Sequence, residues 1–419
     1  MATTNFALDD IVAELNEEQF HKLADLWARL DVLTDGRISD FSPATLSGLG
    51  TQTVKSASGA NVQVDMSIMG KKPAQKVLEK TNPVALLDAL RRNVKHEDPD
   101  TLLVRFLRAR SWKPDESLVM LLKSLAWRIE QNIEDGMLAG GDTRYAHIAK
   151  TSTGPEAQIG KEVVALLSSG ESAVHGRDRK GRLLQYIRVK KHNPKAQGKD
   201  GFEKATILDA ESTRMLLRAP ITTISIVFDL TGFGMGNMDM NALKIMAGGL
   251  QDNYPECLGT VYVYNAPWII NGIWSMIKAW LDPVVASKVQ FVSSLKALSE
   301  FIDPAEIPTY MGGESNWEFK WIEPETLQPL DAESAAKRDS LKATREQLLT
   351  SHIDTTRVWT EEVLTNQPSA TATLAKRREL AQQLRENYWQ LDPYVRGRVM
   401  LDRAGILLPG GKVNMRPNA

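Results

Sequence analysis

The sequence predicts an α/β protein in which helices cover a sheet of mixed or parallel strands, with a helical N-terminal lobe before it and a C-terminal helical extension after it. Three observations support this fold class. Apolar residues recur at helical spacing up to about residue 140. Short apolar strands then alternate with helical stretches between residues 156 and 302. Long, charged segments with leucines at helical spacing follow residue 322.

The N-terminal third is predicted to be helical. Apolar side chains recur at helical spacing in the first part of the chain, and we expect an N-terminal helix within residues 1–33. Residues 34–72 are rich in Ser, Gly and Thr, which indicates a flexible linker. The helical lobe then occupies residues 73–140. Within it, Asp98 is placed to cap a helix that holds Pro99 in its first turn.

The middle of the chain alternates between strands and helices. Short apolar strands separated by helices are typical of a sheet with parallel strands, and this predicts an α/β domain at residues 150–321. The remaining residues, 322–419, form the C-terminal extension, whose charged helices suit an exterior pair. The expected strands of the α/β domain are Leu183–Val189, Ile221–Leu230, Thr260–Tyr264 and Val289–Val292.

Composition restricts the environment and the partners of the protein. The chain has 419 residues and a net charge of −1, so nothing draws it as a whole toward nucleic acid, and any anion site must be local. Its single cysteine, Cys257, excludes an internal disulfide and any site of several cysteines. The N-terminus lacks the basic and apolar regions of a secretory signal. We expect a cytosolic monomer.

The sequence lacks the common catalytic motifs. G-x-S-x-G, H-E-x-x-H and C-x-x-C are absent, and the six histidines are scattered without metal-ligand spacing. The glycines of residues 176–182 and 232–236 resemble phosphate loops, but each lacks a required residue of such a motif. We therefore expect a protein that is not an enzyme and that binds no metal and no cofactor.

Residues 257–277 form an uncharged stretch of 21 residues. Polar residues and Pro267 interrupt it too often for a transmembrane helix, which needs about 20 predominantly apolar residues. From Pro267 onward a helix would carry one narrow polar stripe at Asn271, Ser275 and Lys278, and apolar surface on both sides of it. Such a helix is either buried between the layers of a large domain or in contact with a partner, a ligand or a lipid.

Three charged residues lie beside apolar segments: Arg110 next to Trp112, Glu256 before the uncharged stretch, and Lys288 beyond it. A guanidinium and an ammonium group can bind a phosphate together. A carboxylate can accept hydrogen bonds from the hydroxyl groups of a sugar or polyol. If the three met beside an apolar cavity, they would bind a phosphorylated polyol headgroup. The alternative is an ordinary set of surface ion pairs.

At these residues the chain resembles the CRAL-TRIO lipid-binding family, particularly the non-classical fungal phosphatidylinositol-transfer proteins. The resemblance covers about residues 75–320 and rests on TLLVRFLRARSW, SIVFDLTGFGMGNMD, IPTYMGGE and the long segment from LQDNYPECLG to LDPVVASKV. It implies a sheet that floors a lipid cavity and a mobile gate helix at about 267–285. It also implies that Arg110, Glu256 and Lys288 bind the headgroup. The implied cavity and gate residues are Trp268, Ile273, Trp274, Ile277, Trp280, Leu281 and Val285.

The resemblance implies phosphatidylinositol as the bound lipid. Ser111, Val285, Gly234 and Gly236 stand where the family's phosphatidylcholine exchanger has a lysine or hydroxyl side chains, so we expect a second, more apolar ligand such as a sterol or squalene-like lipid. The function implied is transfer or presentation of lipid between internal membranes, with transient membrane contact and with a lipid kinase or another protein as partner. A lipid-regulated scaffold that senses lipid without net transfer is the alternative.

Overall fold

The computed structural model describes residues 12, 14–36, 38–55 and 61–416. The chain divides into two compact units. The helical unit comprises Met1–Glu134 and Leu330–Tyr394, and the α/β unit comprises Asp135–Pro329 and Val395–Ala419. The expected C-terminal extension is thus shared between the two units.

The core of the helical unit is built by amphipathic helices with well-defined starts. α1 begins after Asn16, whose side chain accepts from the Gln19 N–H in a capping box. Asp98 caps α5 through the Asp100 N–H, and Pro99 follows in the first turn as predicted. The long helices of this unit are α1 (Glu17–Thr34), α4 (Pro83–Asn93), α5 (Pro99–Ala109), α6 (Pro114–Glu130), α15 (Ala332–Leu364) and α16 (Ala370–Val395).

The flexible linker expected at 34–72 was wrong, because the described residues of this segment form short helices and a pair of antiparallel strands. Val62 and Val64 alternate with exposed residues on a strand and are buried, as are Leu46 and Met69 on either side of the hairpin. Buried valines at alternate positions of one short strand pack this segment into the core, although its composition indicated a linker. Its elements are α2 (Pro43–Ser47), the antiparallel strands β1 (Thr51–Lys55) and β2 (Asn61–Asp65), η1 (Ser67–Gly70) and the start of α3 (Lys72–Leu78).

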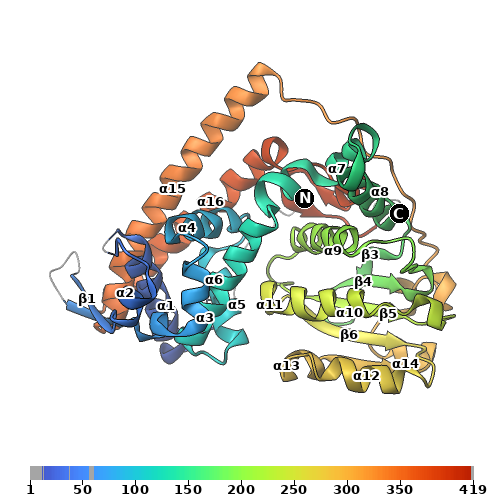
Figure 1. Ribbon diagram of the computed structural model, residues 1–419, viewed down its shortest axis with the longest axis horizontal. Coiled ribbons are helices and arrows are strands. Elements are labelled where there is room, and N and C mark those ends of the chain that lie inside the picture. The colour runs from blue at the N-terminus through green and yellow to red at the C-terminus, as the bar shows by residue number, and fades with distance from the viewer. Residues whose placement is uncertain (1–11, 13, 37, 56–60, 417–419) are drawn as a thin grey trace. The chain divides into compact units, whose positions relative to one another are not determined.

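The expectation of an exterior pair of C-terminal helices was also wrong. Figure 1 shows α15 and α16, in orange and red, against the blue N-terminal helices of the same unit. Trp359 of α15 is 1% exposed and packs in the core cluster of α1, α5 and α6, and Leu384 of α16 is fully buried. The buried positions of α15, among them Leu341, Arg345, Leu349 and His352, recur every three or four residues within a highly charged helix.

A buried ion pair links α16 to α5 within this unit. Arg377 of α16 donates to both carboxylate oxygens of Asp100, over 2.8 and 2.6 Å, while the Trp27 indole N–H donates to Asp100 over 2.7 Å. The Arg377 guanidinium lies 4.1 Å above the ring of Trp359. Burial, and then the charge of Arg377, lower the pKa of His352 to about 3, so this histidine is neutral near pH 7.

The α/β unit contains a five-stranded sheet with strand order β3-β4-β5-β6-β7. β3 pairs antiparallel with β4, and the other neighbours are parallel, which confirms the predicted mixed sheet. All four expected strands are present within a few residues of their predicted limits, while β3 was not predicted. The strands are β3 (Ser172–Arg177), β4 (Leu183–Arg188), β5 (Ile224–Asp229), β6 (Leu258–Tyr264) and β7 (Val289–Val292).

The crossover helices lie on one face of this sheet. The chain moves in one direction from β4 to β7, and right-handed crossovers then place every connecting helix on the same side. The Gln185 amide donates to Asp209 of α9 over 2.6 Å, and Trp274 of α12 packs against Phe291 of β7. Figure 1 shows α9, α10 and α12 in this order along the sheet. The crossover elements are α9 (Lys199–Arg214), α10 (Met240–Lys244), η5 (Ile245–Leu250), α11 (Gln251–Asn253), α12 (Ile270–Lys278) and α13 (Pro283–Ser287).

The opposite face of the sheet is packed over most of its area, although Gln290 of β7 is exposed there. Tyr186, Val227, Tyr262 and Val292 are buried there against the segment that follows β7, which includes Leu298 of α14. This segment comprises α14 (Leu295–Ser299), η6 (Pro304–Glu306) and η7 (Thr309–Met311), and the unit also contains α7 (Ala139–Thr151), α8 (Gly154–Ser168), α17 (Met400–Arg403), β8 (Leu407–Leu408) and β9 (Lys412–Val413).

Candidate functional site

The face of the sheet beneath the crossover helices carries apolar side chains that the protein does not bury. Register places Ile226, Val261 and Val289 side by side, and Phe228, Val263 and Phe291 in the next row. Val261 is buried, four of the others are half-buried, and Phe291 is 43% exposed. We call the incompletely covered set the open face; its members are Ile226, Phe228, Val263, Val289 and Phe291.

Helix α12 lies over this open face and has apolar residues on two sides. Trp274 contacts Phe291 with ring centroids 5.6 Å apart in an edge-to-face arrangement. Ile270 is the only buried residue of α12. On the outer side Met276 is 39% exposed, and Trp268, just before the helix, is 84% exposed. The other predicted gate residues, all half-buried, are Ile273, Ile277, Trp280, Leu281 and Val285.

The predicted gate segment, 267–285, is two helices rather than one. The α-helix begins at Ile270, after a turn at Pro267 and Trp268, and ends at Lys278. α13 then starts after Asp282, whose carboxylate caps the Val284 N–H over 2.8 Å. The helical segment is therefore interrupted at Asp282 and Pro283, with proline in the first turn of α13.

The elements α10, η5 and α11, which we call the second wall, contact the gate segment. The Gln251 side-chain oxygen of α11 accepts from the Asp282 N–H over 2.7 Å. Lys244 of α10 places its ammonium group 5.7 Å from the ring centre of Trp280. Both contacts lie near the junction of α12 and α13. This end of the gate segment is therefore held by the neighbouring wall.

Glu256 and Lys288 meet at the amino-terminal edge of β6 and β7. The Lys288 ammonium lies 3.7 Å from a Glu256 carboxylate oxygen, and their side chains are 21% and 30% exposed. The backbone fixes both positions: the Cys257 carbonyl accepts from Ile224 N–H, and the Lys288 carbonyl from Val261 N–H, each over 2.9 Å. At 3.7 Å the pair is an ion pair rather than a close hydrogen bond.

The backbone of Glu256 has φ = 56°, a left-handed conformation that is uncommon for residues other than glycine. Its chain segment is held by Tyr254, whose hydroxyl donates over 2.8 Å to the fully buried Glu211 of α9. Strained backbone of this kind persists where surrounding contacts enforce it and is frequent at functional sites. The sequence did not indicate Tyr254 or Glu211, since a buried glutamate has no signature in a helical pattern.

Arg110, the third predicted headgroup residue, belongs to the helical unit. It ends α5, is half-buried, and donates to the Ala109 carbonyl over 3.0 Å. Ser111 and Trp112, which follow it, have φ angles of 51° and 60°. Of the three predicted residues the structure thus brings Glu256 and Lys288 together and places Arg110 at a strained helix end in the other unit.

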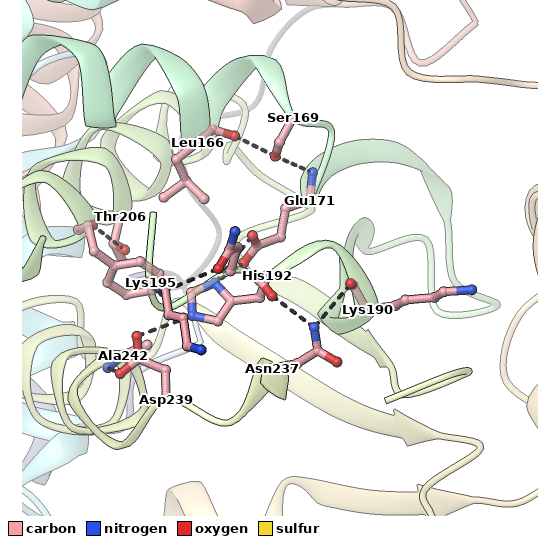
Figure 2. Close-up of polar contacts among 12 residues, drawn as sticks. Leu166, Ser169, Glu171, Lys190, His192, Lys195, Thr206, Asn237, Asp239 and Ala242 are labelled. Carbon is pink, nitrogen blue, oxygen red and sulfur yellow. Dashed lines mark hydrogen bonds and ion pairs between the residues drawn. The ribbon is translucent and has the colours of Figure 1, made fainter. Parts of the chain in front are cut away.

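His192 is a buried residue that the sequence interpretation passed over. Figure 2 shows its ring between Glu171 and Asp239, with ring nitrogens 3.0 and 3.2 Å from the carboxylate oxygens. Burial lowers the pKa of His192, but the hydrogen bonds to Glu171 and Asp239 outweigh it and leave the pKa raised. Asp239 also caps α10 through the Asn241 N–H, so His192 positions the start of the second wall.

Comparison with known proteins places both units in one family. Residues 167–313 match the CRAL/TRIO domain, and residues 75–123 match the CRAL/TRIO N-terminal domain. A CRAL-TRIO domain-containing protein of Schizosaccharomyces pombe is 34% identical over 335 residues, which cover 80% of this chain and 72% of that protein. The chain belongs to the CRAL-TRIO family.

Other CRAL-TRIO relatives carry more specific names. The phosphatidylinositol transfer protein CSR1 of Eremothecium gossypii is 32% identical over 310 residues, 74% of this chain and 68% of that protein. The phosphatidylinositol/phosphatidylcholine transfer protein SFH7 of Arabidopsis thaliana is 27% identical over 170 residues, 36% of this chain and 31% of that protein. The crystal structure of Sfh5 aligns with 72% of this chain and 89% of its own, with 17% identity and a TM-score of 0.43.

The two CRAL-TRIO matches include all the predicted site residues. The domain match spans the sheet, the gate segment, the second wall, Glu256 and Lys288. The N-terminal match contains Arg110. Within the ranges that the structure describes, no cluster of His, Cys, Asp and Glu could hold a metal ion. No helix in those ranges is long and apolar enough to cross a membrane.

Proposed function

We propose that the protein binds phosphatidylinositol with its acyl chains on the open face and its headgroup at Glu256 and Lys288, and that it transfers or presents this lipid. One observation supports this most strongly: an incompletely covered apolar surface and a pair of opposite charges 3.7 Å apart lie on neighbouring strands of one sheet. The surface suits acyl chains, and the charges suit a polar head.

The headgroup chemistry follows from the two side chains. The Lys288 ammonium donates to a phosphate, and the Glu256 carboxylate accepts from inositol hydroxyls. Arg110 is proposed as the second phosphate donor, because a guanidinium can bind two phosphate oxygens at once. The name of the Eremothecium relative, a phosphatidylinositol transfer protein, agrees with this choice of lipid.

The energetics of lipid transfer explain the two-sided gate segment. Each buried methylene is worth about 0.8 kcal/mol, so exposing about 30 methylenes of a two-chain lipid to water would cost roughly 24 kcal/mol. Exchange is therefore practicable only where the cavity opens against a bilayer that offers equally apolar surroundings. In this proposal the inner side of α12 contacts the lipid, and the outer residues Trp268 and Met276 contact the membrane during opening.

A second, more apolar ligand such as a sterol or squalene-like lipid is also part of the proposal. Val285 is half-buried, and its carbonyl accepts from the Lys288 N–H. Its side chain offers no hydroxyl to a choline-lipid phosphate. Gly234 and Gly236 offer no side chain at all. The open face carries only hydrocarbon groups, which suit a ligand without a polar head.

The test is transfer of labelled phosphatidylinositol between vesicles by the double variant Glu256→Ala/Lys288→Ala. We expect transfer to be lost while the fold and its thermal unfolding are kept, since both side chains are partly exposed. The matched control removes the exposed ion pair of Arg338 and Asp339, which are 2.8 Å apart on α15, and should transfer normally. Native mass spectrometry of co-purified lipid identifies the ligands. Normal transfer by a folded double variant would refute the headgroup assignment.

A further inference from the structure

The helical unit contains a groove of about 640 Å³ between α3 and α6. Lysines line its rim from both sides: Lys72, Lys76 and Lys80 from α3 and the turn after it, and Lys123 from α6. All four are exposed. We call this feature the lysine groove.

The lysine groove carries an excess of positive charge, with four lysines and one acidic residue in its lining. Within the described residues none of the four lysines forms an ion pair, and the only acidic residue that lines the groove is Glu130. Lys72, Lys76 and Lys80 are spaced four residues apart, so like charges repel along one side of a helical segment. This local excess stands out in a chain whose net charge is −1. Such an array is stabilised by an anionic partner.

The groove also offers apolar contact. Trp127 of α6 is half-buried and lines the groove, and the neighbouring Ile129 is 38% exposed. Val77 and Ala126 also belong to the lining of the groove. Tryptophan beside lysine is the combination that favours the boundary between water and a bilayer, where the indole reaches the headgroup level.

We propose that the lysine groove docks the protein on an anionic bilayer surface. Lysine is a flexible point charge that suits many mobile headgroups, whereas recognition of one fixed phosphate favours the planar fork of arginine, and arginine is absent from the groove lining. The exposed apolar side chain beside the lysines suits a bilayer better than a fully polar polyanion. The proposal rests on the proposed function only in that both require membrane contact.

Docking by the lysine groove predicts a dependence on lipid charge and on salt. A lysine near an anionic bilayer contributes about 1 kcal/mol, or about fivefold in binding, so neutralising three should weaken binding about 100-fold. Salt should weaken wild-type binding as well, because the Debye length falls from about 10 Å at 0.1 M to about 3 Å at 1 M. Neutral vesicles should bind weakly at any salt concentration.

The experiment is flotation of the full chain with vesicles of phosphatidylcholine alone or with 30 mol% phosphatidylserine. The variant Lys72→Gln/Lys76→Gln/Lys80→Gln should lose binding to the anionic vesicles. The charge-preserving variant with arginine at these positions should keep it. The control Lys337→Gln/Lys342→Gln/Lys376→Gln removes the same charge from exposed positions of α15 and α16 and should bind nearly as the wild type does.

The outcomes separate docking from lipid loading. A glutamine variant that still carries phosphatidylinositol by native mass spectrometry, but no longer floats with anionic vesicles, supports the groove. If no variant carries lipid while flotation still depends on the groove, the proposed function fails and the docking proposal stands. Equal vesicle binding by the groove variant and the control variant would overturn the docking proposal. Groove-dependent binding of a short RNA duplex without vesicle binding would also overturn it.

Discussion

The helical unit and the α/β unit differ in how fully they bury their apolar residues. The helical unit brings α15 and α16 from the far end of the chain to cover α1 and α5, and even buries the pair of Arg377 and Asp100 to do so. The α/β unit packs one face of its sheet and leaves the open face beneath α12 incompletely covered. Segments that are distant in the sequence fill the interior of the helical unit, while the α/β unit leaves apolar side chains of its sheet partly exposed.

The largest effect should come from breaking the ion pair of the helical unit. Arg377→Met would leave Asp100 buried with only the Trp27 indole as a described donor partner, and removing one member of a buried pair costs about 3–5 kcal/mol. Urea unfolding followed by tryptophan fluorescence measures this, because Trp27 and Trp359 lie beside Arg377. A loss below 1 kcal/mol would mean that the C-terminal helices do not support this core.

The two faces of the sheet can be compared with one type of substitution. Val227→Ala removes a fully buried side chain and should cost about 2–3 kcal/mol, including the cavity it leaves. Val263→Ala, on the next strand and the open face, should cost less than about 1 kcal/mol in lipid-free protein, because Val263 is only half-buried. Thermal unfolding with and without lipid checks both. Equal costs without lipid would show that the open face is packed.

Protonation of His192 should make the second wall dependent on pH. Its pKa is raised in the folded protein, so its stabilising effect is complete below about pH 6.5, the unfolded value, and is lost as the pH rises through the folded pKa. One such proton limits the slope to about 1.4 kcal/mol per pH unit. Hydrogen exchange of residues 239–253 should therefore speed up with pH more than the intrinsic rate does.

The variant His192→Gln is the control for this dependence. Glutamine cannot titrate, so the additional pH dependence of exchange at 239–253 should disappear while the packed face of the sheet is unaffected. An unchanged pH profile would assign the effect to another group.

The smallest effect concerns Gly272 in α12. A Cβ atom at this position would meet nothing within 4 Å, so close packing does not explain the glycine. Gly272→Ala should stabilise the helix by up to about 1 kcal/mol. If the glycine serves as a hinge, vesicle-to-vesicle transfer should become slower although the protein becomes more stable. Transfer at the wild-type rate would exclude the hinge.

Much of the α/β unit was predictable, because its signals are local. The β-branched run Thr260–Tyr264 and the proline after Asp282 mark a strand and a helix start wherever they occur. The resemblance to the CRAL-TRIO family was confirmed by the family matches. The charges of Glu256 and Lys288 beside apolar segments had already indicated these two residues, and the structure brings them within 3.7 Å. The binding role of these two residues and of Arg110 stays a prediction.

What the sequence could not reveal depends on contacts between distant residues. Arg377 resembles any surface arginine of a charged helix until Asp100, 277 positions away, lies against it. His192 has no motif, because its partners Glu171 and Asp239 come from two other elements. Since α15 and α16 belong to a core, deleting the C-terminal extension would not test the scaffold alternative cleanly; substitutions on their exposed sides would.

The open face also has a consequence for the stability of the protein when no ligand covers it. A ligand that binds only the folded state stabilises it by about 2.7 kcal/mol when its concentration is a hundred times its dissociation constant. If lipid occupies the open face, the chain's lifetime in the cell would follow the supply of that lipid. An unloaded molecule would present Phe291 and its apolar neighbours to chaperones and proteases. The cellular abundance of the protein would then depend on the concentration of the lipid that it binds.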